Sequence, residues 1–377
     1  MKTLHTVKPE PVRAYLATIK APHQNQKQAS AELRGLSETL ELEIAGEEAI
    51  TVREESGRYG MGSGKAQEVA EKAAEAGAQC IIFDRELSPS QQRNWESLCG
   101  LPVIDRQELI IRIFASRAKT REAELQAQLA ELLYALPRLS HKYIDLSRQR
   151  GGRYGTRGAG ETRLEADKRQ IRDRIGILRK EIEEVRNTRK LQRKQRKKQG
   201  VSSCALVGYT NAGKSSLHRA LTGSDVFIED KLFATLDPTA RRVYRQGSSG
   251  GGKNIIFIDT VGFIRRLPHN LIDAFKATLE ELTQADLLIH VLDASDPEWR
   301  DHITTVHSLV RELGAEKIPL VTAINKSDLL PQDELSAFQA AFAAAGHPSP
   351  PAYAPVSAKN RENLEELWKL IEKTLKF

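Results

Sequence analysis

Cysteines are scarce in this sequence, long apolar runs are missing, and the N-terminus carries no apolar stretch. The three cysteines (Cys80, Cys99 and Cys204) show no Cys-x-x-Cys spacing, which argues against a disulfide framework and against a zinc site. No run reaches the roughly 18 apolar residues that a membrane-spanning helix needs, and residues 1–5 lack the apolar core of a signal peptide. These absences predict a cytoplasmic protein with no stable membrane insertion.

The size and composition of the chain fit a folded protein of several domains. Its 377 residues leave room for two or three domains, each with its own core. Charged residues make up 28% and hydrophobic residues 40% of the sequence, which is typical of a globular protein. The net charge is +7, and its position along the chain matters more than its size.

Residues 1–118 alternate between strand-like and helix-like patterns. Alternating or continuous apolar segments predict four strands, at 12–19, 49–53, 80–83 and 102–105. Helical patterns, with capping residues such as Ser88 and Gly77, predict three helices, at 65–76, from residue 88 onward and at 107–118. The alternation predicts a small N-terminal α/β domain.

Residues 119–200 predict an antiparallel hairpin of two amphipathic helices, because apolar residues recur at helical spacing over 120–136 and 162–199. The loop between them, 150–161, holds five glycines, three arginines and one tyrosine. Composition alone favours a solvated linker. The alternative is an RNA-facing loop, in which Arg153 and Arg157 contact phosphates and Tyr154 stacks on a base.

The second helix ends in a basic run, residues 186–198, with eight basic residues and no acidic one. A charge run is usually a solvated face, but repulsion of this strength favours a polyanionic partner. RNA phosphates are the preferred interpretation. An anionic membrane surface is the weaker one, because the run lacks bulky apolar residues on an opposite face. The residues of this run predicted to face RNA are Arg193, Lys194, Arg196, Lys197 and Lys198.

A phosphate-binding loop, Gly-x4-Gly-Lys-Ser, occupies residues 208–215 between a short apolar run and a helical pattern. Two glycines let backbone N–H groups wrap a phosphate, the lysine neutralises β- and γ-phosphate oxygens, and the serine hydroxyl holds Mg²⁺. The predicted nucleotide contacts here are Gly208, Tyr209, Thr210, Asn211, Ala212, Gly213, Lys214, Ser215 and Ser216.

Two further segments match the switches of a GTPase. In 232–239, which includes Phe233 as a nucleotide contact, one threonine is expected to bind Mg²⁺ and sense the γ-phosphate; Thr235 is preferred and Thr239 is the alternative. Asp259-Thr-Val-Gly262 follows a buried strand pattern; its aspartate binds Mg²⁺ through water and its glycine N–H bonds the γ-phosphate. The predicted catalytic residues are Lys214, Thr235 and Gly262, and the predicted metal ligands are Ser215, Thr235 and Asp259.

The base-recognition boxes follow in order. Asp328 accepts two hydrogen bonds from guanine N1–H and the 2-amino group, a donor pair that adenine lacks. The predicted guanine contacts are Asn325, Lys326, Asp328, Ser357, Ala358 and Lys359. Five boxes in this order predict a guanine-nucleotide switch over 201–377, with GTP or GDP and Mg²⁺ bound. The predicted fold class is α/β: a P-loop GTPase domain with a small N-terminal α/β domain and a connecting antiparallel two-helix hairpin.

Phe263 stands directly after Gly262, where many GTPases carry a glutamine that orients the attacking water. A phenyl ring cannot hydrogen-bond water, so intrinsic hydrolysis is expected to be slow unless another group supplies the orientation. One candidate is a partner that reorders the switches. Another is K⁺ bound by the side-chain carbonyl of Asn211.

The sequence resembles the HflX-type GTPases, in the Obg-related branch of the translation-factor-class GTPases. The resemblance covers almost the whole chain and rests first on Phe-Ala-Thr-Leu-Asp-Pro-Thr at 233–239 and Asp-Thr-Val-Gly-Phe at 259–263. Earlier in the chain it rests on the motifs at 64–68, 83–91, 103–106, 113–122, 136–139 and 158–165. The last of these, Gly-Ala-Gly-Glu-Thr-Arg-Leu-Glu, is very specific.

This resemblance implies a bacterial protein, expected as a monomer, that binds the large ribosomal subunit and ribosomal RNA. It also implies a part in splitting stalled ribosomes under stress, with the hairpin directed toward the peptidyl-transferase region. ATP binding by the N-terminal domain is attributed to the family as well. Residues 60–65 are glycine-rich but lack full phosphate-loop spacing, which favours a turn before a helix.

Three other functions remain open from the sequence. An assembly GTPase acting on immature large subunits is not separated from a splitting factor. In an ATP-using RNA-remodelling protein the hairpin would do the work, but Asp328 selects guanine and argues against this as the main activity. A regulatory module acting on a protein partner would leave the basic run without a role.

Overall fold

The computed structural model divides into two compact units. One comprises Met1–Ser116 and Gln128–Ile177, the other Arg117–Ala127 and Leu178–Phe377. The structure describes residues 11–20, 26–52, 56–149, 159–223, 232–233, 239–246, 252–265, 275, 281–345 and 352–376, and only the backbone of residues 20, 26, 140–149, 159–163, 192–194 and 196–197. The division into domains 1–118, 119–200 and 201–377 stays a prediction.

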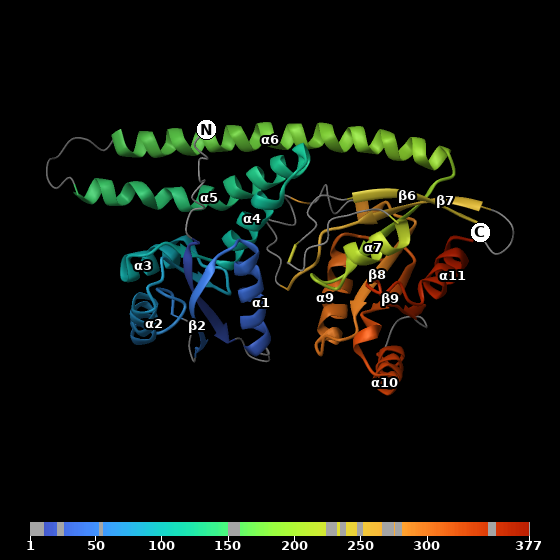
Figure 1. Cartoon of the computed structure of the whole chain (residues 1–377). Coiled ribbons are helices and arrows are strands. Elements are labelled where there is room, and N and C mark those ends of the chain that lie inside the picture. Colours follow the sequence, from blue (N-terminus) through green and yellow to red (C-terminus); the bar gives the residue numbers. More distant parts are fainter. Residues whose placement is uncertain are drawn as a thin grey trace, which may run out of the picture. The chain divides into compact units, whose positions relative to one another are not determined.

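The first unit contains a four-stranded parallel sheet with the strand order β2-β1-β3-β4 (Figure 1). Its strands are β1 (Arg13–Lys20), β2 (Glu43–Thr51), β3 (Cys80–Phe83) and β4 (Val103–Ile104). The helices between and after them are α1 (Gln26–Thr39), α2 (Ser63–Glu75), α3 (Pro89–Cys99) and α4 (Arg106–Arg117). All four predicted strands are present, although β2 begins earlier than predicted, and α1 was not predicted.

Trp95 of α3 is at the centre of this unit's core. Its ring is fully buried, 4.7 Å from the ring of Phe83 and 5.5 Å from that of Tyr59, and its Nε1 donates to the Tyr59 carbonyl oxygen at 3.0 Å. The glycine-rich segment that follows Tyr59 turns at Gly60, with a φ of 74°, and leads into α2 at Ser63. This is the turn before a helix that the sequence favoured.

Two long helices, α5 (Arg121–Gln149) and α6 (Ala159–Lys198), run antiparallel (Figure 1). Arg121 Nη2, at the start of α5, donates to Glu181 Oε2 of α6 at 2.8 Å. Gln128 Oε1, seven residues later in α5, accepts from Arg174, which precedes Glu181 by seven residues in α6. The predicted hairpin is therefore present. The predicted loop was too long at its end, because residues 159–161 already belong to α6.

Each unit anchors one stretch of these helices through an arginine. In the first unit Arg138 of α5 donates to Asp105 Oδ2 at 3.0 Å and to the Leu87 carbonyl oxygen at 2.9 Å. In the second unit Arg189 of α6 lies 2.7 Å from Glu122 Oε2 and 3.8 Å from Glu281 Oε1. Glu122 and Glu281 are both buried, so these ion pairs are shielded from water and hold the base of α5 and α6 to the segment around Glu281.

The second unit contains a six-stranded sheet with the order β10-β9-β8-β5-β7-β6, in which only the edge strand β6 is antiparallel. Its strands are β5 (Ser202–Val207), β6 (Thr239–Gln246), β7 (Gly252–Asp259), β8 (Leu287–Asp293), β9 (Leu320–Asn325) and β10 (Tyr353–Pro355). Its helices are α7 (Lys214–Thr222), α9 (Trp299–Glu312), the 3₁₀ helix η1 (Ser327–Leu329), α10 (Gln332–Ala343) and α11 (Leu364–Leu375). Strand β6 was not predicted.

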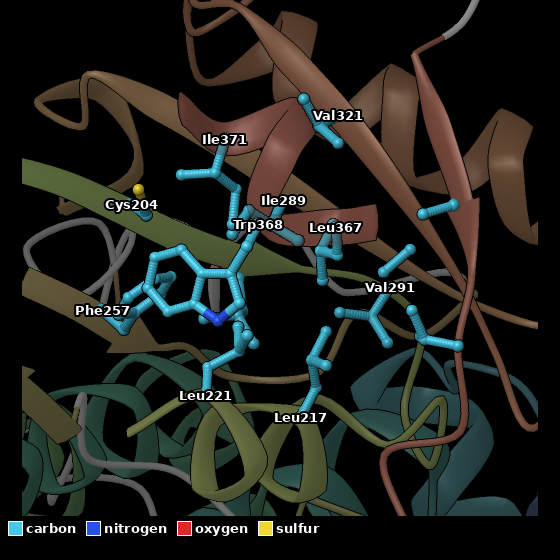
Figure 2. Packing of buried hydrophobic residues seen from close by; sticks show 14 of the residues in the cluster. Cys204, Leu217, Leu221, Phe257, Ile289, Val291, Val321, Leu367, Trp368 and Ile371 are labelled. Carbon is cyan, nitrogen blue, oxygen red and sulfur yellow. The ribbon is translucent and has the colours of Figure 1, made fainter. Parts of the chain in front are cut away.

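Helices cover both faces of this sheet, and alternate residues of β7 face opposite ways. Phe257 packs edge-on against Trp368 of α11, with ring centroids 5.3 Å apart, in a cluster shared with α7 (Figure 2). Ile258 packs on the other face with Val306 and Leu309 of α9. Because β5 and β7 pair in parallel, their carboxyl ends lie at the same edge of the sheet, where open α/β sheets bind ligands. The predicted α/β fold class is confirmed.

Among the described residues, no helix is both long enough and apolar enough to cross a membrane.

Candidate nucleotide-binding site

The phosphate loop, residues 208–215, connects the carboxyl end of β5 to the first turn of α7. Two of its glycines have positive φ, 156° at Gly208 and 89° at Gly213. A Cβ on Gly208 would lie 2.3 Å from the Val291 carbonyl oxygen, and one on Gly213 would lie 2.2 Å from Asn325 Nδ2. Only glycine therefore fits at either position, and the sequence motif is matched by the conformation that it requires.

Lys214 and Ser215 begin α7 and lie close to the end of β7. Lys214 Nζ donates to the Tyr209 carbonyl oxygen at 2.7 Å. Burial lowers the pKa of Lys214 to about 8, although the charge of Asp259 acts in the opposite direction. Ser215 Oγ donates to Asp259 Oδ2 at 2.7 Å. A hydroxyl and a carboxylate oxygen at this spacing are ligands of the kind that Mg²⁺ prefers.

The segment after β7 is joined to the phosphate loop through backbone hydrogen bonds. Thr210 N–H donates to the Phe263 carbonyl oxygen at 2.8 Å, and Phe263 N–H donates to the Gly208 carbonyl oxygen at 3.0 Å. A Cβ on Gly262 would lie 2.8 Å from Thr210 Cγ2 and 3.0 Å from Lys214 Nζ. Gly262 is thus in direct contact with the loop, as a γ-phosphate sensor requires.

Tyr209 ties the phosphate loop to α9, a connection that the sequence did not reveal. Its ring stacks on His302 with centroids 3.8 Å apart and 11° between the planes, and its hydroxyl accepts from the Arg265 N–H at 3.1 Å. The Arg265 guanidinium in turn pairs with Glu298, the residue directly before α9. The aromatic residue at the second position of the loop was the available signal. Its ring packs against protein, and its carbonyl oxygen holds Lys214.

Asn325, at the end of β9, joins the two guanine-recognition loops to the phosphate loop. Its Nδ2 donates to the Ala212 carbonyl oxygen at 2.8 Å, and its Oδ1 accepts from Ala358 N–H at 3.0 Å. The side chain is 2% exposed. Three boxes that are distant in sequence are therefore held together by one buried amide.

The other guanine-loop residues differ in exposure. Asp328 is exposed in η1, where a carboxylate can receive a base edge. Lys326 has a positive φ of 61° and its Nζ lies 2.6 Å from Asp293 Oδ2, so its stem is held by that ion pair. Ser357 is fully buried and its hydroxyl accepts from Asn360 N–H at 3.1 Å; Lys359 is exposed.

Several predicted residues cannot be placed fully. Thr235, Arg153, Tyr154 and Arg157 lie outside the described residues, and Arg193, Lys194, Arg196 and Lys197 lie in α6 without described side chains. The alternative switch threonine, Thr239, is the first residue of β6 and stands opposite Asp259 in the strand register. Phe233 is 2% exposed with a φ of 55°. Asn211, the K⁺ candidate, and Lys198, the last residue of α6, are exposed, and Ser216 is half-buried.

Three family models together match most of the chain between residues 27 and 326. The model described as GTP-binding GTPase N-terminal matches residues 27–115, the GTP-binding GTPase middle region matches 117–196, and the 50S ribosome-binding GTPase matches 203–326.

Similar proteins include GTPase HflX of Akkermansia muciniphila, 45% identical over 347 residues that cover 89% of this chain and 78% of that protein. GTPase HflX of Alkalihalophilus pseudofirmus is 48% identical over 80% of this chain and 70% of its own length. GTPase HflX of Escherichia coli K12 is 47% identical over a stretch that covers 72% of this chain and 63% of that protein.

Among solved structures, a GTP-binding protein from the archaeon Sulfolobus solfataricus in complex with GDP is similar in fold. It is 24% identical, with a TM-score of 0.50 over 97% of this chain and 98% of that one. A structure described as the SsGBP and GDP complex is 25% identical, with a TM-score of 0.53 over 96% of this chain and 98% of that one. The assembled phosphate and guanine loops, the family models and the extent of these identities lead to one conclusion: the chain is a GTPase that belongs to the HflX family.

Proposed function

We propose that this GTPase binds the large ribosomal subunit and, under stress, separates the subunits of stalled ribosomes, with its nucleotide state controlling the binding. The match of residues 203–326 to a family described as 50S ribosome-binding GTPase is the observation that carries the proposal. In this picture GTP and Mg²⁺ occupy the site described above. Lys214 and Gly262 contact the γ-phosphate, while Ser215, Thr235 and Asp259 hold the metal.

The arm formed by α5 and α6 is the proposed RNA-binding element. Helix α6 continues to Lys198, so the basic run is presented on a helix and not on a coil. Two of its arginines already have acidic partners, since Arg186 lies 2.7 Å from Glu183 and Arg189 lies 2.7 Å from Glu122. These two arginines therefore offer less charge to RNA than unpaired guanidinium groups would, and the residues proposed to contact phosphates follow them in the run.

The direct test is GTP hydrolysis by the purified protein, alone and with purified large ribosomal subunits, with ATP as a parallel substrate. Strong stimulation of GTP turnover by the subunits is expected, because Phe263 leaves the water without its usual orienting glutamine. Equal turnover with and without subunits would contradict the ribosomal assignment. Stimulated ATP turnover in place of GTP turnover would favour the RNA-remodelling alternative.

A second test addresses the arm. Replacing the RNA-facing residues of α6 by glutamine should weaken subunit binding and lower the slope of its salt dependence by about one for each phosphate that the helix no longer neutralises. Neutralising five exposed or half-buried basic residues nearer the middle of the same helix is the matched control, and it should change binding less. Equal effects of both sets would contradict the assignment of the run. The test residues are Arg193, Lys194, Arg196, Lys197 and Lys198; the control residues are Lys168, Arg169, Arg172, Arg179 and Lys180.

Splitting and assembly roles are separated by the substrate. A splitting factor lowers the fraction of intact ribosomes in a sedimentation assay when GTP is present, whereas an assembly factor acts only on immature large subunits.

We also propose that K⁺ binds at Asn211 in the phosphate loop. This residue is exposed and its backbone φ is 62°. Equal hydrolysis rates in Na⁺ and K⁺ would exclude that cation.

A further inference from the structure

Thr210, the third residue of the phosphate loop, buries a hydroxyl that makes no hydrogen bond to protein. The residue is 6% exposed, and its Oγ1 has no partner within the described part of the chain. The backbone N–H of the same residue is satisfied, because it donates to the Phe263 carbonyl oxygen at 2.8 Å. Folded proteins keep few unpaired buried hydroxyls, so this one calls for a physical explanation.

The Thr210 side chain lies beside the two groups expected to contact the γ-phosphate. Of all neighbouring atoms, Thr210 Cγ2 is the one that a Cβ on Gly262 would meet first, at 2.8 Å, and Lys214 Nζ would be 3.0 Å away. Rotation of the Thr210 side chain to another staggered rotamer about the Cα–Cβ bond brings Oγ1 to the position that Cγ2 occupies in this structure. The hydroxyl therefore reaches the side of Gly262 without any movement of the backbone.

The side chain of Phe263 cannot fill the same role. It is 1% exposed and packs in the apolar cluster with Val207, Ile258 and Leu282. Its N–H and its carbonyl oxygen are both bonded to the phosphate loop, which fixes the backbone and keeps the ring in that cluster. The polar group that orients water must come from another residue, and the buried Thr210 hydroxyl is one rotamer change away from this place.

We propose that the Thr210 hydroxyl is a catalytic group that orients the water attacking GTP. A hydroxyl has one donor and two acceptor positions, so Oγ1 can accept a hydrogen bond from the water while it donates to a γ-phosphate oxygen. The water oxygen forms its bond to the γ-phosphorus as the bond to the β,γ-bridging oxygen breaks, and that electron pair leaves with GDP. The proton lost by the water passes to the departing phosphate, and Thr210 keeps its own. The proposal rests on GTP hydrolysis at this site and does not involve the ribosome.

Two substitutions separate the hydroxyl from the rest of the side chain. Thr210→Val keeps the shape and removes the hydroxyl, while Thr210→Ser keeps the hydroxyl and removes the methyl group. For each protein we would measure single-turnover GTP hydrolysis without ribosomes, the affinity for GDP, and the affinity for GDP with aluminium fluoride, which mimics the phosphoryl group in transfer. Thr210→Val is expected to slow hydrolysis by about 10- to 100-fold and to weaken the aluminium fluoride complex by a similar factor. Its GDP affinity should be unchanged, and Thr210→Ser should behave as the wild type does.

The melting temperature of the nucleotide-free protein gives a readout that is independent of activity. Valine removes an unpaired buried hydroxyl, so Thr210→Val should melt at the same temperature as the wild type or higher. A lower melting temperature would mean that the hydroxyl has a structural partner, and it would overturn the proposal. Wild-type hydrolysis by Thr210→Val, an equal loss in Thr210→Ser, or equal weakening of GDP and its aluminium fluoride complex would overturn it too. None of these outcomes bears on binding to the large subunit, which is tested separately.

Discussion

Nucleotide binding is expected to place a proton on Lys214 at mildly alkaline pH. The side chain is 7% exposed, and burial lowers the pKa of its ammonium group to about 8, against the opposing charge of Asp259. Bound phosphates would add negative charge beside the ammonium group, which favours its protonated form. The free site therefore holds a partly neutral lysine at pH 8, and the loaded site a fully charged one.

The size of the effect follows from that pKa. At pH 8 about half of the free sites carry a neutral lysine, so binding of GDP should take up about half a proton, compared with about 0.9 at pH 9. Calorimetry in buffers of different ionisation enthalpy measures this uptake as the slope of the observed enthalpy against the buffer enthalpy. At these pH values the phosphates of the nucleotide are already ionised, since their pKa lies near about 6. Uptake near zero across this range would refute the reasoning.

The same shift sets the sign of a stability change in the nucleotide-free protein. The folded pKa of Lys214 lies below the ordinary value of 10.5, so the unfolded chain binds more protons in that window and stability rises with pH. The contribution is present above pH 10.5 and lost as pH falls through about 8. At about 1.4 kcal/mol per pKa unit the full change is about 3 kcal/mol. The difference in unfolding free energy between the wild type and Lys214→Met should therefore rise between about pH 7.5 and 9.5, and a flat difference would contradict the assignment.

Three further predictions concern the frame of the site. Gly208→Ala would place a Cβ 2.3 Å from the Val291 carbonyl oxygen. Because neither the loop backbone nor the backbone of β8 can move freely, the free energy of unfolding, measured in urea, should fall by about 3 kcal/mol. Asp328→Asn should lower GTP affinity by about 100-fold or more and make xanthosine triphosphate, which offers an acceptor in place of the 2-amino group, the tighter ligand in a competition assay. Arg189→Ala removes a counter-charge of the buried Glu122 and should lower the free energy of unfolding by about 2 kcal/mol. Adding Glu122→Gln to the same protein should restore most of that free energy.

The phosphate loop, the box at 259–262 and the guanine loops were the easiest segments to recognise in the sequence, because each is a contiguous segment that follows a strand. The contacts between boxes were not predictable. Asn325 was predicted as a guanine contact, yet its two amide atoms bond to Ala212 and Ala358, on two other loops. Such contacts depend on how the strands are ordered in the sheet. The stacking of Tyr209 on His302 has the same origin, since α9 follows the phosphate loop by many residues.

Two of the elements that were not predicted, α1 and β6, lack the apolar signal on which sequence patterns depend. In α1, Ser37 and Thr39 occupy buried positions and satisfy their hydroxyls on the carbonyl oxygens of Leu33 and Gly35, at 2.9 and 2.8 Å. Buried hydroxyls of this kind dilute the helical period of apolar residues. In β6, an edge strand, only Val243 packs against the core cluster, and most of the other residues are polar. An edge strand with one partly buried aliphatic side chain has almost no alternation to detect.

The boundary between the two compact units has a mechanical consequence. It crosses α5 after Ala127 and α6 after Ile177, so at both places the units are joined through continuous helices and not through loops. A helix transmits displacement along its axis, whereas a sharp bend disturbs its backbone hydrogen bonds. Gly176, directly before Ile177 in α6, is exposed, and no neighbouring atom accounts for its missing side chain. Glycine weakens a helix, so α6 is stiff along most of its length and bends most easily at the junction of the two units.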